Sequence, residues 1–403
     1  MASPPPPILG SQALSALTDE LLEEIFLRVS TPTDLVRASV GCASFRRIIT
    51  DRSFLRRFRA IHPPPLLGFI GVDDFHSAQP PHPSAPLVRA LAHADDFFSF
   101  IPAGKWSTPW CTLDVRQGRV LLECSPEQVT SEYYDITDLG DFELVVCDPL
   151  FRRYVLLPPV PDELTAGHGR LVDFGAFLAP TGDDDEETSF RVICTAWNET
   201  RLFAFVFYSV TEQWNLAASP SWYSLGTDMP SSHHCSTCFD YAQGCFYLTA
   251  LWRDKMLMLD SVRMDFSIIN NDWSIYRASG HGQPCISVSA EGIPLMFFFG
   301  DLNENGSIDD IPRLHVTKLN DTRDQWELEK IIPLPKDYEF FTLGAAEDFL
   351  FLRGVPEEDH STRHYFALEI NTSELKRVCR MRRRFFRKKE RKKCECTTDK
   401  EVT

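Results

Sequence analysis

The feature that most constrains the fold is a repeat in the larger part of the chain. Five segments each hold an apolar run, a turn and a following strand, with turns near residues 147, 208, 259, 319 and 369. Successive turns are therefore 61, 51, 60 and 50 residues apart, and one or two further strand-like runs precede each turn. Units of about four strands at such a period stack radially as the blades of a propeller.

The number of blades follows from how far the repeat extends. Five units are visible, and residues 66–115 hold enough apolar sequence to supply most of a sixth. We therefore expect an all-β propeller over residues 63–378 with five to six blades, and we favour six. A parallel β-helix has a shorter period and a β-sandwich does not repeat. Aromatic residues make up 12% of the chain, with 30 Phe, which is enough to fill such a core.

A helical pattern precedes the repeat. Apolar residues at 21, 22, 25, 26 and 29 form a stripe of helical spacing, with Thr18 as its expected cap. Thr31 and Pro32 begin a second helix, and two shorter apolar patterns reach residue 61. This module carries more apolar surface than so small a unit can bury. It is either a helical cap docked on the strand region or a surface built for a partner's helices.

The helical module resembles an F-box. The carrying segment is LTDELLEEIFLRVSTPTDLVRASVGCASFRRIITDRSFLRRF, in which LTDELL stands for the family's Leu-Pro-x-Glu-Leu-Leu and DLVR for Asp-Leu-x-Arg. Thr18 replaces a proline, Phe45 replaces a tryptophan, and Gly41 widens the Val-Cys pair. The resemblance implies contact with a Skp-family adaptor through ten residues: Leu17, Leu21, Leu22, Ile25, Phe26, Pro32, Leu35, Val40, Cys42 and Phe45.

The strand region carries a second resemblance. CDPLFRRYVLLPP is similar to a blade of plant F-box-associated propellers, and residues 110–275 resemble grass F-box proteins with this C-terminal region. Pro63–Pro65 marks the break between the two parts. We thus expect an α+β multidomain chain: a disordered Pro-rich arm (1–14), an F-box helical module (15–62), a propeller for substrate recognition (63–378) and a basic disordered tail (379–403).

Charge is distributed unevenly along the chain. Residues 376–393 carry a net charge of +11, so the remainder carries −27 of the total of −16. The acidic body argues against nucleic acid as its partner. The basic segment is a solvated end, a nuclear import signal, or a contact for membrane or nucleic acid. We expect the protein in the nucleus and the cytoplasm, with the nuclear share due to this segment.

Motifs for metal binding or catalysis are weak. DLNENGSIDDIP at 301–312 has a calcium-loop beginning but Pro312 where the bidentate Glu belongs, so a hairpin loop is favoured. HHCSTC at 233–238 has zinc-ligand residues but no second CxxC, which favours reduced thiols. No GxSxG, P-loop, GxGxxG or HExxH sequence occurs. We expect no cofactor and no metal, and six Trp residues spread over the repeat are interpreted as blade packing.

The resemblance implies a function without catalysis. It is that of a substrate-receptor subunit of a Skp–cullin–F-box (SCF) ubiquitin ligase, which binds the adaptor, through it the cullin, and an unknown target protein on the propeller. The chain would position the target for ubiquitin transfer by other subunits. We expect no membrane partner. The alternatives are a binding scaffold outside any ligase, with an F-box degenerate at Thr18 and Phe45, and a propeller enzyme or sugar binder.

Overall fold

The structure, a computed structural model, forms two compact units, Met1–Pro65 and Leu66–Thr403. It describes residues 17–29, 32–62, 65–70, 75–90, 98–106, 108–126, 139–165, 171, 173–180, 189–229, 239–248, 255–270, 284–289, 291–302, 308–320, 325–346, 348–382 and 400–402. Each unit is described by itself below. No helix in these residues is long and apolar enough to cross a membrane.

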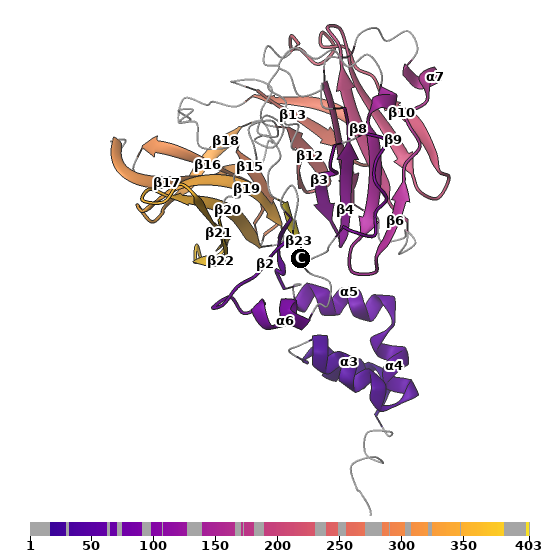
Figure 1. The fold of residues 1–403 in the computed structure, drawn as a ribbon, viewed down its shortest axis with the longest axis vertical. Helices are drawn as coiled ribbons and strands as arrows, with labels where there is room; N and C mark the ends of the chain where they lie inside the picture. Colours follow the sequence, from indigo (N-terminus) through magenta and orange to yellow (C-terminus); the bar gives the residue numbers. More distant parts are fainter. Residues whose placement is uncertain are drawn as a thin grey trace, which may run out of the picture. The chain divides into compact units, whose positions relative to one another are not determined.

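The described part of the first unit is a cluster of four short helices (Figure 1). They are α2 (Asp19–Leu27), α3 (Pro32–Gly41), α4 (Ala43–Ile49) and α5 (Arg52–Ile61). Apolar residues three and four positions apart lie on one side of a helix. The apolar sides of these helices pack together in a common core. That core consists of Leu22, Phe26, Leu27, Leu35, Ile48, Ile49, Phe54 and Phe58. The expected start of the second helix at Pro32 is confirmed.

The ends of these helices are capped in different ways. Thr18 stands at the expected position before α2, but its side chain makes no capping hydrogen bond. The N–H of Phe45 donates to the Cys42 sulfur at 3.5 Å, which caps α4. The Asp51 carboxylate accepts from the N–H of Ser53 at 2.9 Å and caps α5. These bonds, led by that of the Ser53 side chain, lower the pKa of Asp51.

The second unit contains five blades, each a four-stranded antiparallel sheet. Blade 1 is β3 (Cys111–Arg116), β4 (Arg119–Cys124), β5 (Glu143–Asp148) and β6 (Arg153–Leu156). Blade 2 is β7 (Asp173–Ala179), β8 (Arg191–Trp197), β9 (Leu202–Tyr208) and β10 (Gln213–Ala218). Blade 3 is β11 (Phe239–Ala242), β12 (Cys245–Leu248), β13 (Lys255–Asp260) and β14 (Asp265–Asn270). Blade 4 is β15 (Cys285–Val288), β16 (Pro294–Leu302), β17 (Ile308–Leu319) and β18 (Trp326–Pro333). Blade 5 is β19 (Tyr338–Ala346), β20 (Phe349–Pro356), β21 (Thr362–Glu369) and β22 (Leu375–Arg382).

The predicted propeller is therefore confirmed, whereas the preference for six blades is wrong. Each turn that anchored the repeat in the sequence falls at the end of the third strand of a blade. The described residues between 66 and 110 do not form a four-stranded blade, because they provide two strands of three residues each, β1 (Gly68–Ile70) and β2 (Phe75–Ser77). The apolar residues of this stretch have another role, in the seam between the last blade and the first.

Apolar side chains of the middle strands point alternately to the two faces of a blade, so each blade packs against both neighbouring blades. In β9, Phe203, Phe205 and Phe207 lie in the cluster shared with blade 1, whereas Leu202, Ala204 and Val206 lie in the cluster shared with blade 3. Successive side chains of a strand point to opposite faces, so an uninterrupted apolar strand serves two interfaces. The same division recurs at the interfaces of blades 3 with 4 and 4 with 5.

The seam between blades 5 and 1 is filled by apolar residues from the described parts of 66–101. β1 pairs with β2 and with β23 (Lys400–Val402), and these three strands form one sheet. Phe69 is fully buried, and its ring lies 5.1 Å from that of Tyr365 and 5.7 Å from that of Phe351 in blade 5. The N–H of Gln79 donates to Val378 O at 2.8 Å. This sheet closes the ring where a sixth blade was expected.

The turns after the third strands share one backbone conformation. Arg152, Glu212, Met264 and Ser373 have φ between 53° and 58° in blades 1, 2, 3 and 5. The N–H of Met264 donates to Asp260 O at 2.9 Å, and the equivalent bonds in blades 2 and 5 are 2.8 Å long. This four-residue connection explains why the turns were the clearest part of the repeat in the sequence.

Other expectations have mixed outcomes. Residues 303–307 connect the antiparallel pair β16 and β17, so the expected hairpin at 301–312 is confirmed, although these residues lie outside the described ones. Residues 181–188, an acidic stretch for which a hairpin loop is also expected, connect the antiparallel pair β7 and β8. Residues 73–96, a Pro-, His- and Ala-rich stretch expected to be a long loop or an irregular insertion, contain β2 and the short helix α6 (Ala85–Ala90). HHCSTC at 233–238 and the arm 1–14 lie outside the described residues.

The C-terminal boundary of the propeller also changes. β22 runs to Arg382, which pairs with Thr362, so residues 379–382 belong to blade 5 rather than to the basic tail. Val378 and Cys379 are 1% exposed, which ties this strand to the core. Residues 400–402 form β23, and residues 383–399 lie outside the described residues.

Candidate functional site

The structure divides the ten residues predicted to contact an adaptor into two groups. Leu22, Phe26 and Leu35 are between 4% and 5% exposed and belong to the core of the helical unit. Leu17 and Phe45 are partly buried against that core, and the Phe26 and Phe45 rings lie 5.1 Å apart. These residues set the positions of the helices, because removing any of them would leave a cavity between helices. The side chain of Pro32 lies outside the described residues.

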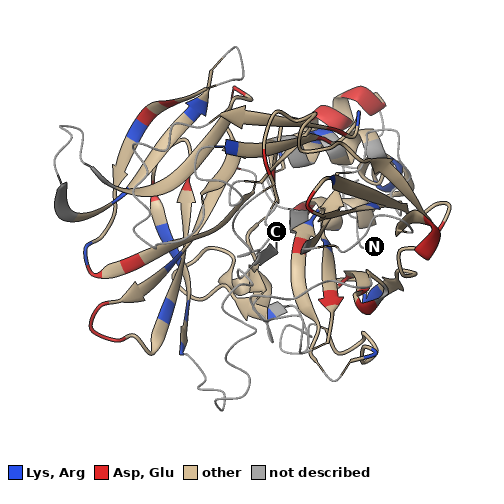
Figure 2. Ribbon diagram, turned by 90° about the horizontal axis from the view of Figure 1, so that it is seen from above, with Lys and Arg blue, Asp and Glu red and all other residues tan. Residues whose placement is uncertain are grey.

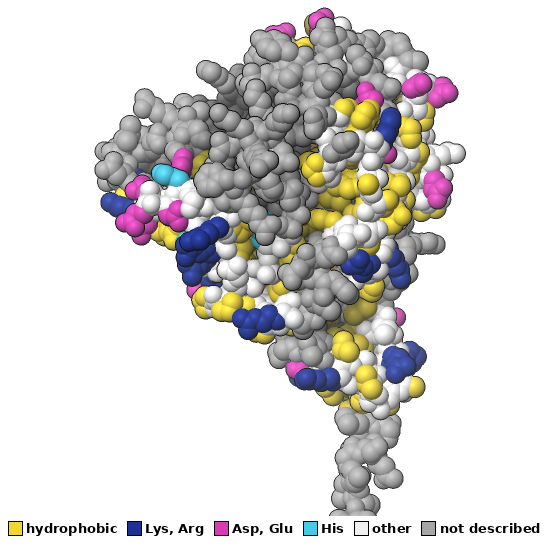
Figure 3. Space-filling model, viewed as in Figure 1, with side chains coloured by type: hydrophobic (Ala, Val, Ile, Leu, Met, Phe, Trp, Pro, Cys, Tyr) yellow, Lys and Arg dark blue, Asp and Glu magenta, His cyan; other side chains and the backbone are white. Residues whose placement is uncertain are grey.

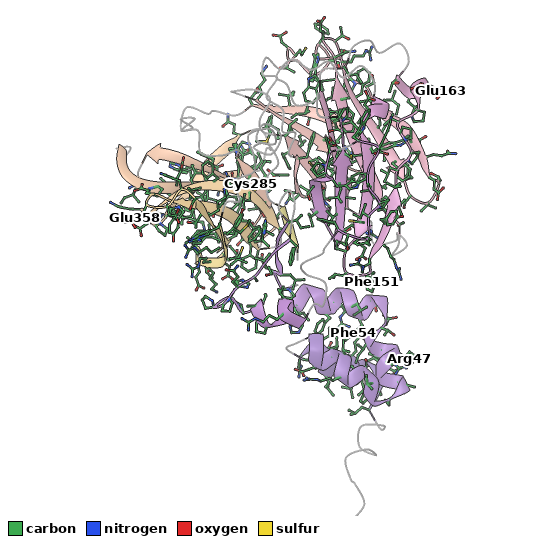
Figure 4. All side chains as sticks on the ribbon, in the orientation of Figure 1. Arg47, Phe54, Phe151, Glu163, Cys285 and Glu358 are labelled. Atoms are coloured by element: carbon green, nitrogen blue, oxygen red, sulfur yellow. The ribbon has the colours of Figure 1, made fainter. Side chains whose placement is uncertain are left out.

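The other predicted residues lie at the surface. Leu21 is 53% exposed, Ile25 46% and Val40 70%, and Cys42 is exposed as well. Leu21 and Ile25 are four residues apart in α2 and therefore share one side of that helix. Figure 4 labels Phe54 in the core of the same unit, for comparison.

One surface residue was missed by the sequence analysis. Val36 is 62% exposed and stands four residues before Val40 in α3, so the two share a side of that helix. The signal was available, because the i, i+4 spacing of two valines in a short helix can be read directly. We call Leu21 with Ile25 on α2 and Val36 with Val40 on α3 the adaptor stripes, after the adaptor contact that the sequence predicts for Leu21, Ile25 and Val40.

Ion pairs link the helices beside these stripes. Arg57 of α5 donates to Glu23 Oε1 and to Glu24 Oε1 of α2, both at 2.7 Å. Arg47 of α4 pairs with Asp19, and the hydrogen bond to Asp19 raises the pKa of Arg47. These side chains are half-exposed for the most part, so solvent screens the pairs and each contributes little to stability. They orient the helices and leave the aliphatic side chains of the adaptor stripes facing solvent.

The described Trp side chains of the repeat pack within or between the blades of the propeller. Trp197, Trp214 and Trp222 are at most 6% exposed, and Trp326 is partly buried, which confirms blade packing for these four. The indole N–H of Trp214 donates to Pro158 O at 2.8 Å, and that of Trp222 donates to Asn198 O at 2.9 Å. Trp252 and Trp273 lie outside the described residues.

The described part of the chain contains no group of three or more His, Cys, Asp or Glu placed to hold a metal ion. Burial raises the pKa of the Cys147 thiol to about 12 and that of Cys194 well above its usual value. Both thiols therefore stay protonated at neutral pH and are poor nucleophiles. Charges of both signs are spread over the ribbon in Figure 2 rather than gathered on one face.

Comparisons with known proteins add little to this geometry. Neither a protein-family model nor a curated protein matches the sequence. A prolyl endopeptidase structure is similar with a TM-score of 0.35 at 9% identity, covering 68% of this chain and 36% of that one. TolB from Acinetobacter baumannii gives 0.35 at 11% identity, covering 64% and 52%. The GH93 alpha-L-arabinofuranosidase of Fusarium graminearum gives 0.34 at 9% identity, covering 67% and 91%. The chain thus spans about a third to a half of the length of the first two.

Proposed function

We propose that this protein is a substrate-receptor subunit of an SCF-type ubiquitin ligase. Its helical unit is an F-box that docks a Skp-family adaptor and through it a cullin, and its propeller binds the target protein. The five-bladed propeller is consistent with a protein-binding receptor. The F-box assignment rests on the resemblance of residues 17–58 to that family, and the plant origin rests on the same kind of resemblance in the strand region.

One observation carries the proposal furthest. The four short helices of the described helical unit hold an apolar core of eight residues and still leave five large aliphatic side chains in solvent, Ile61 and the four of the adaptor stripes. Helices whose apolar residues exceed their internal core are the usual docking elements of small helical modules. Leu22, Phe26 and Leu35 then act by holding α2 and α3 in place, and the adaptor stripes make the contact.

The proposed role of the chain is positioning rather than chemistry. A receptor that holds a target near a ubiquitin-charged enzyme raises the local concentration of the target's lysines. The propeller supplies a rigid ring of five blades, and its loops supply the specificity.

Co-purification from plant cells tests the proposal. The full chain should retain the Skp-family adaptor, whereas a chain with Leu21→Asp and Ile25→Asp should lose it, because two charges would be buried at a dry interface. Val262→Asp is a matched control, since Val262 is an 83% exposed valine on the propeller. Equal recovery of the adaptor with all three chains would refute the F-box assignment. Target capture without any adaptor would favour the scaffold alternative.

A further inference from the structure

The outermost strand of blade 1 differs from the other outermost strands. All four residues of β6 are exposed, whereas β10, β14, β18 and β22 each bury at least one residue against a neighbouring blade or the seam. Yet three of the four residues of β6 are large and apolar: Tyr154 is 43% exposed, Val155 43% and Leu156 48%. The Tyr154 ring lies 6.4 Å from that of Phe100 in the seam, but packing between blades does not account for the other apolar residues of this strand.

The exposed apolar surface continues into the turn before β6. Leu150 is 51% exposed and Phe151 69%, so seven consecutive residues, 150–156, face solvent. Figure 4 labels Phe151 at the tip of this hairpin, and Figure 3 shows hydrophobic side chains gathered on the side of the propeller that carries β6. A contiguous apolar patch of this kind on a folded protein marks an interaction surface.

The backbone of β6 has a free side. β6 is the last strand of its sheet and pairs only with β5 among the described strands. The N–H of Leu157 donates to Leu144 O of β5 at 2.9 Å, which fixes the alternation along the strand. Arg153 and Val155 then share the inward direction of Leu157, and the N–H and C=O groups of Tyr154 and Leu156 point outward. Among the described strands none pairs with these outward groups, and an added strand would bond to them.

The side chains of β6 sort onto two faces. Tyr154 and Leu156 share one face of the sheet, while Arg153 and Val155 share the other. The guanidinium of Arg153 lies 5.5 Å from the Phe151 ring centre, and it has no carboxylate partner among the described residues. The adjacent carboxylate, that of Asp148, accepts the N–H groups of Leu150 and Phe151 at 3.1 Å. One face is thus apolar, and the other carries a positive charge that forms no ion pair with a described residue.

Arg152 adds a second positive charge at the start of the strand. Its guanidinium donates to Ser99 Oγ at 3.0 Å and lies 5.1 Å from the Phe100 ring centre. Both contacts hold this side chain at the seam beside β6 without neutralising it. A second copy of this chain pairing along β6 would bring four arginines together on one short edge, which disfavours self-association there.

We propose that β6 is a strand-addition site for an extended segment of a partner protein in which apolar and acidic residues alternate. The main chain of that segment pairs with Tyr154 and Leu156. Its apolar side chains cover the Tyr154 and Leu156 face, and its carboxylates reach Arg153 on the other face. This site lies on the rim of the propeller, and it does not depend on adaptor docking by the helical unit.

The test uses the full chain and a fluorescent octapeptide of alternating valine and glutamate, followed by anisotropy. Leu156→Pro removes one outward N–H and leaves the pairing with β5 intact, so it should weaken binding by about tenfold or more. Leu156→Ala keeps that N–H and should weaken binding less. Arg153→Glu alters an exposed side chain without touching the core, and it should reverse the preference towards an octapeptide of alternating valine and lysine.

Three outcomes would overturn the proposal. One is no binding of the valine–glutamate peptide by the wild-type chain. Another is equal binding by the wild-type, Leu156→Pro and Arg153→Glu chains, with circular dichroism showing each to be folded. A dimer on gel filtration that is lost in Leu156→Pro would assign β6 to self-association instead. Adaptor binding should be the same in all of these variants, so failure here is separate from failure of the F-box proposal.

Discussion

Leu21 and Leu22 are neighbours in α2, yet 53% of the Leu21 side chain is exposed and only 4% of Leu22. The boundary between core and surface of the helical unit therefore runs between them. Leu22 therefore stabilises the packing of the helices, whereas Leu21 is exposed and, in the proposed function, contacts the adaptor.

Alanine substitutions at these two positions should differ in stability. Leu22→Ala leaves a cavity between helices and should lower the free energy of unfolding of the helical unit by about 2–5 kcal/mol. Leu21→Ala should change it by about 0.5 kcal/mol or less. Amide hydrogen exchange within α2 reports on this unit separately from the propeller. Equal acceleration of exchange in the two variants would place both side chains in the same environment, contrary to the structure.

Gly300 and His315 form a tight contact between β16 and β17. A Cβ atom at Gly300 would lie 2.7 Å from His315 Nε2, and the imidazole is 1% exposed and stacked on Phe298. Gly300→Ala should therefore destabilise the propeller by about 1–3 kcal/mol. In a double-mutant cycle, Gly300→Ala should lower the free energy of unfolding by less when His315 is also replaced by alanine. Strictly additive shifts in thermal unfolding would show that the contact does not limit residue 300.

His364 should make the stability of the propeller depend on pH. Its Nδ1 lies 3.0 Å from the Tyr338 hydroxyl, and burial, followed by Arg377 and Arg380, lowers its pKa, against a smaller opposing effect of Asp359. The unfolded chain thus binds a proton at a higher pH than the folded one. Stability is complete above the ordinary histidine pKa of about 6.5 and falls as pH drops from there towards the folded pKa.

The variant His364→Gln should flatten this dependence in thermal unfolding measured between about pH 7.5 and pH 5. His82 also has a lowered pKa, chiefly through burial, and should leave a residual slope of the same sign. A slope unchanged by His364→Gln would assign the effect to other groups.

The basic segment should direct part of the protein to the nucleus, by the interpretation of its Lys and Arg runs as an import signal. Truncation after residue 378 would cut β22, so substitution is the better test. Replacing Arg387–Lys389 and Arg391–Lys393 by glutamine leaves β22 and β23 in place. A fluorescent fusion should then lose nuclear signal in plant cells. An unchanged ratio of nuclear to cytosolic fluorescence would favour the solvated-end interpretation.

The sequence predicted the repeat but not how the ring closes. Turns after the third strands are marked by strong apolar runs and a fixed connection length, so all five could be located. The seam was interpreted as a sixth blade because its buried residues, such as Phe69 and Ile70, look like those of any blade strand. Its third strand, β23, comes from the opposite end of the unit, and no local pattern reveals a pairing across so many residues.

Core and surface residues of the helical unit could be told apart from the sequence only in part, for a similar reason. Helical spacing shows which residues share a side, but α2 is apolar over a wide arc, so spacing alone did not separate Leu22 from Leu21. β22 was divided at residue 378 because Arg380 and Arg382 suggested a charged tail. In the structure they alternate with Cys379 and Met381 along an edge strand, which is a common arrangement for long charged side chains.

The most direct test of the central claim is a calorimetric titration of purified Skp-family adaptor into the full chain. The F-box proposal predicts saturable binding with one adaptor per chain. It also predicts that Val36→Asp and Val40→Asp together abolish that binding while the melting transition of the propeller is unchanged. A folded wild-type chain that takes up no adaptor would contradict the account.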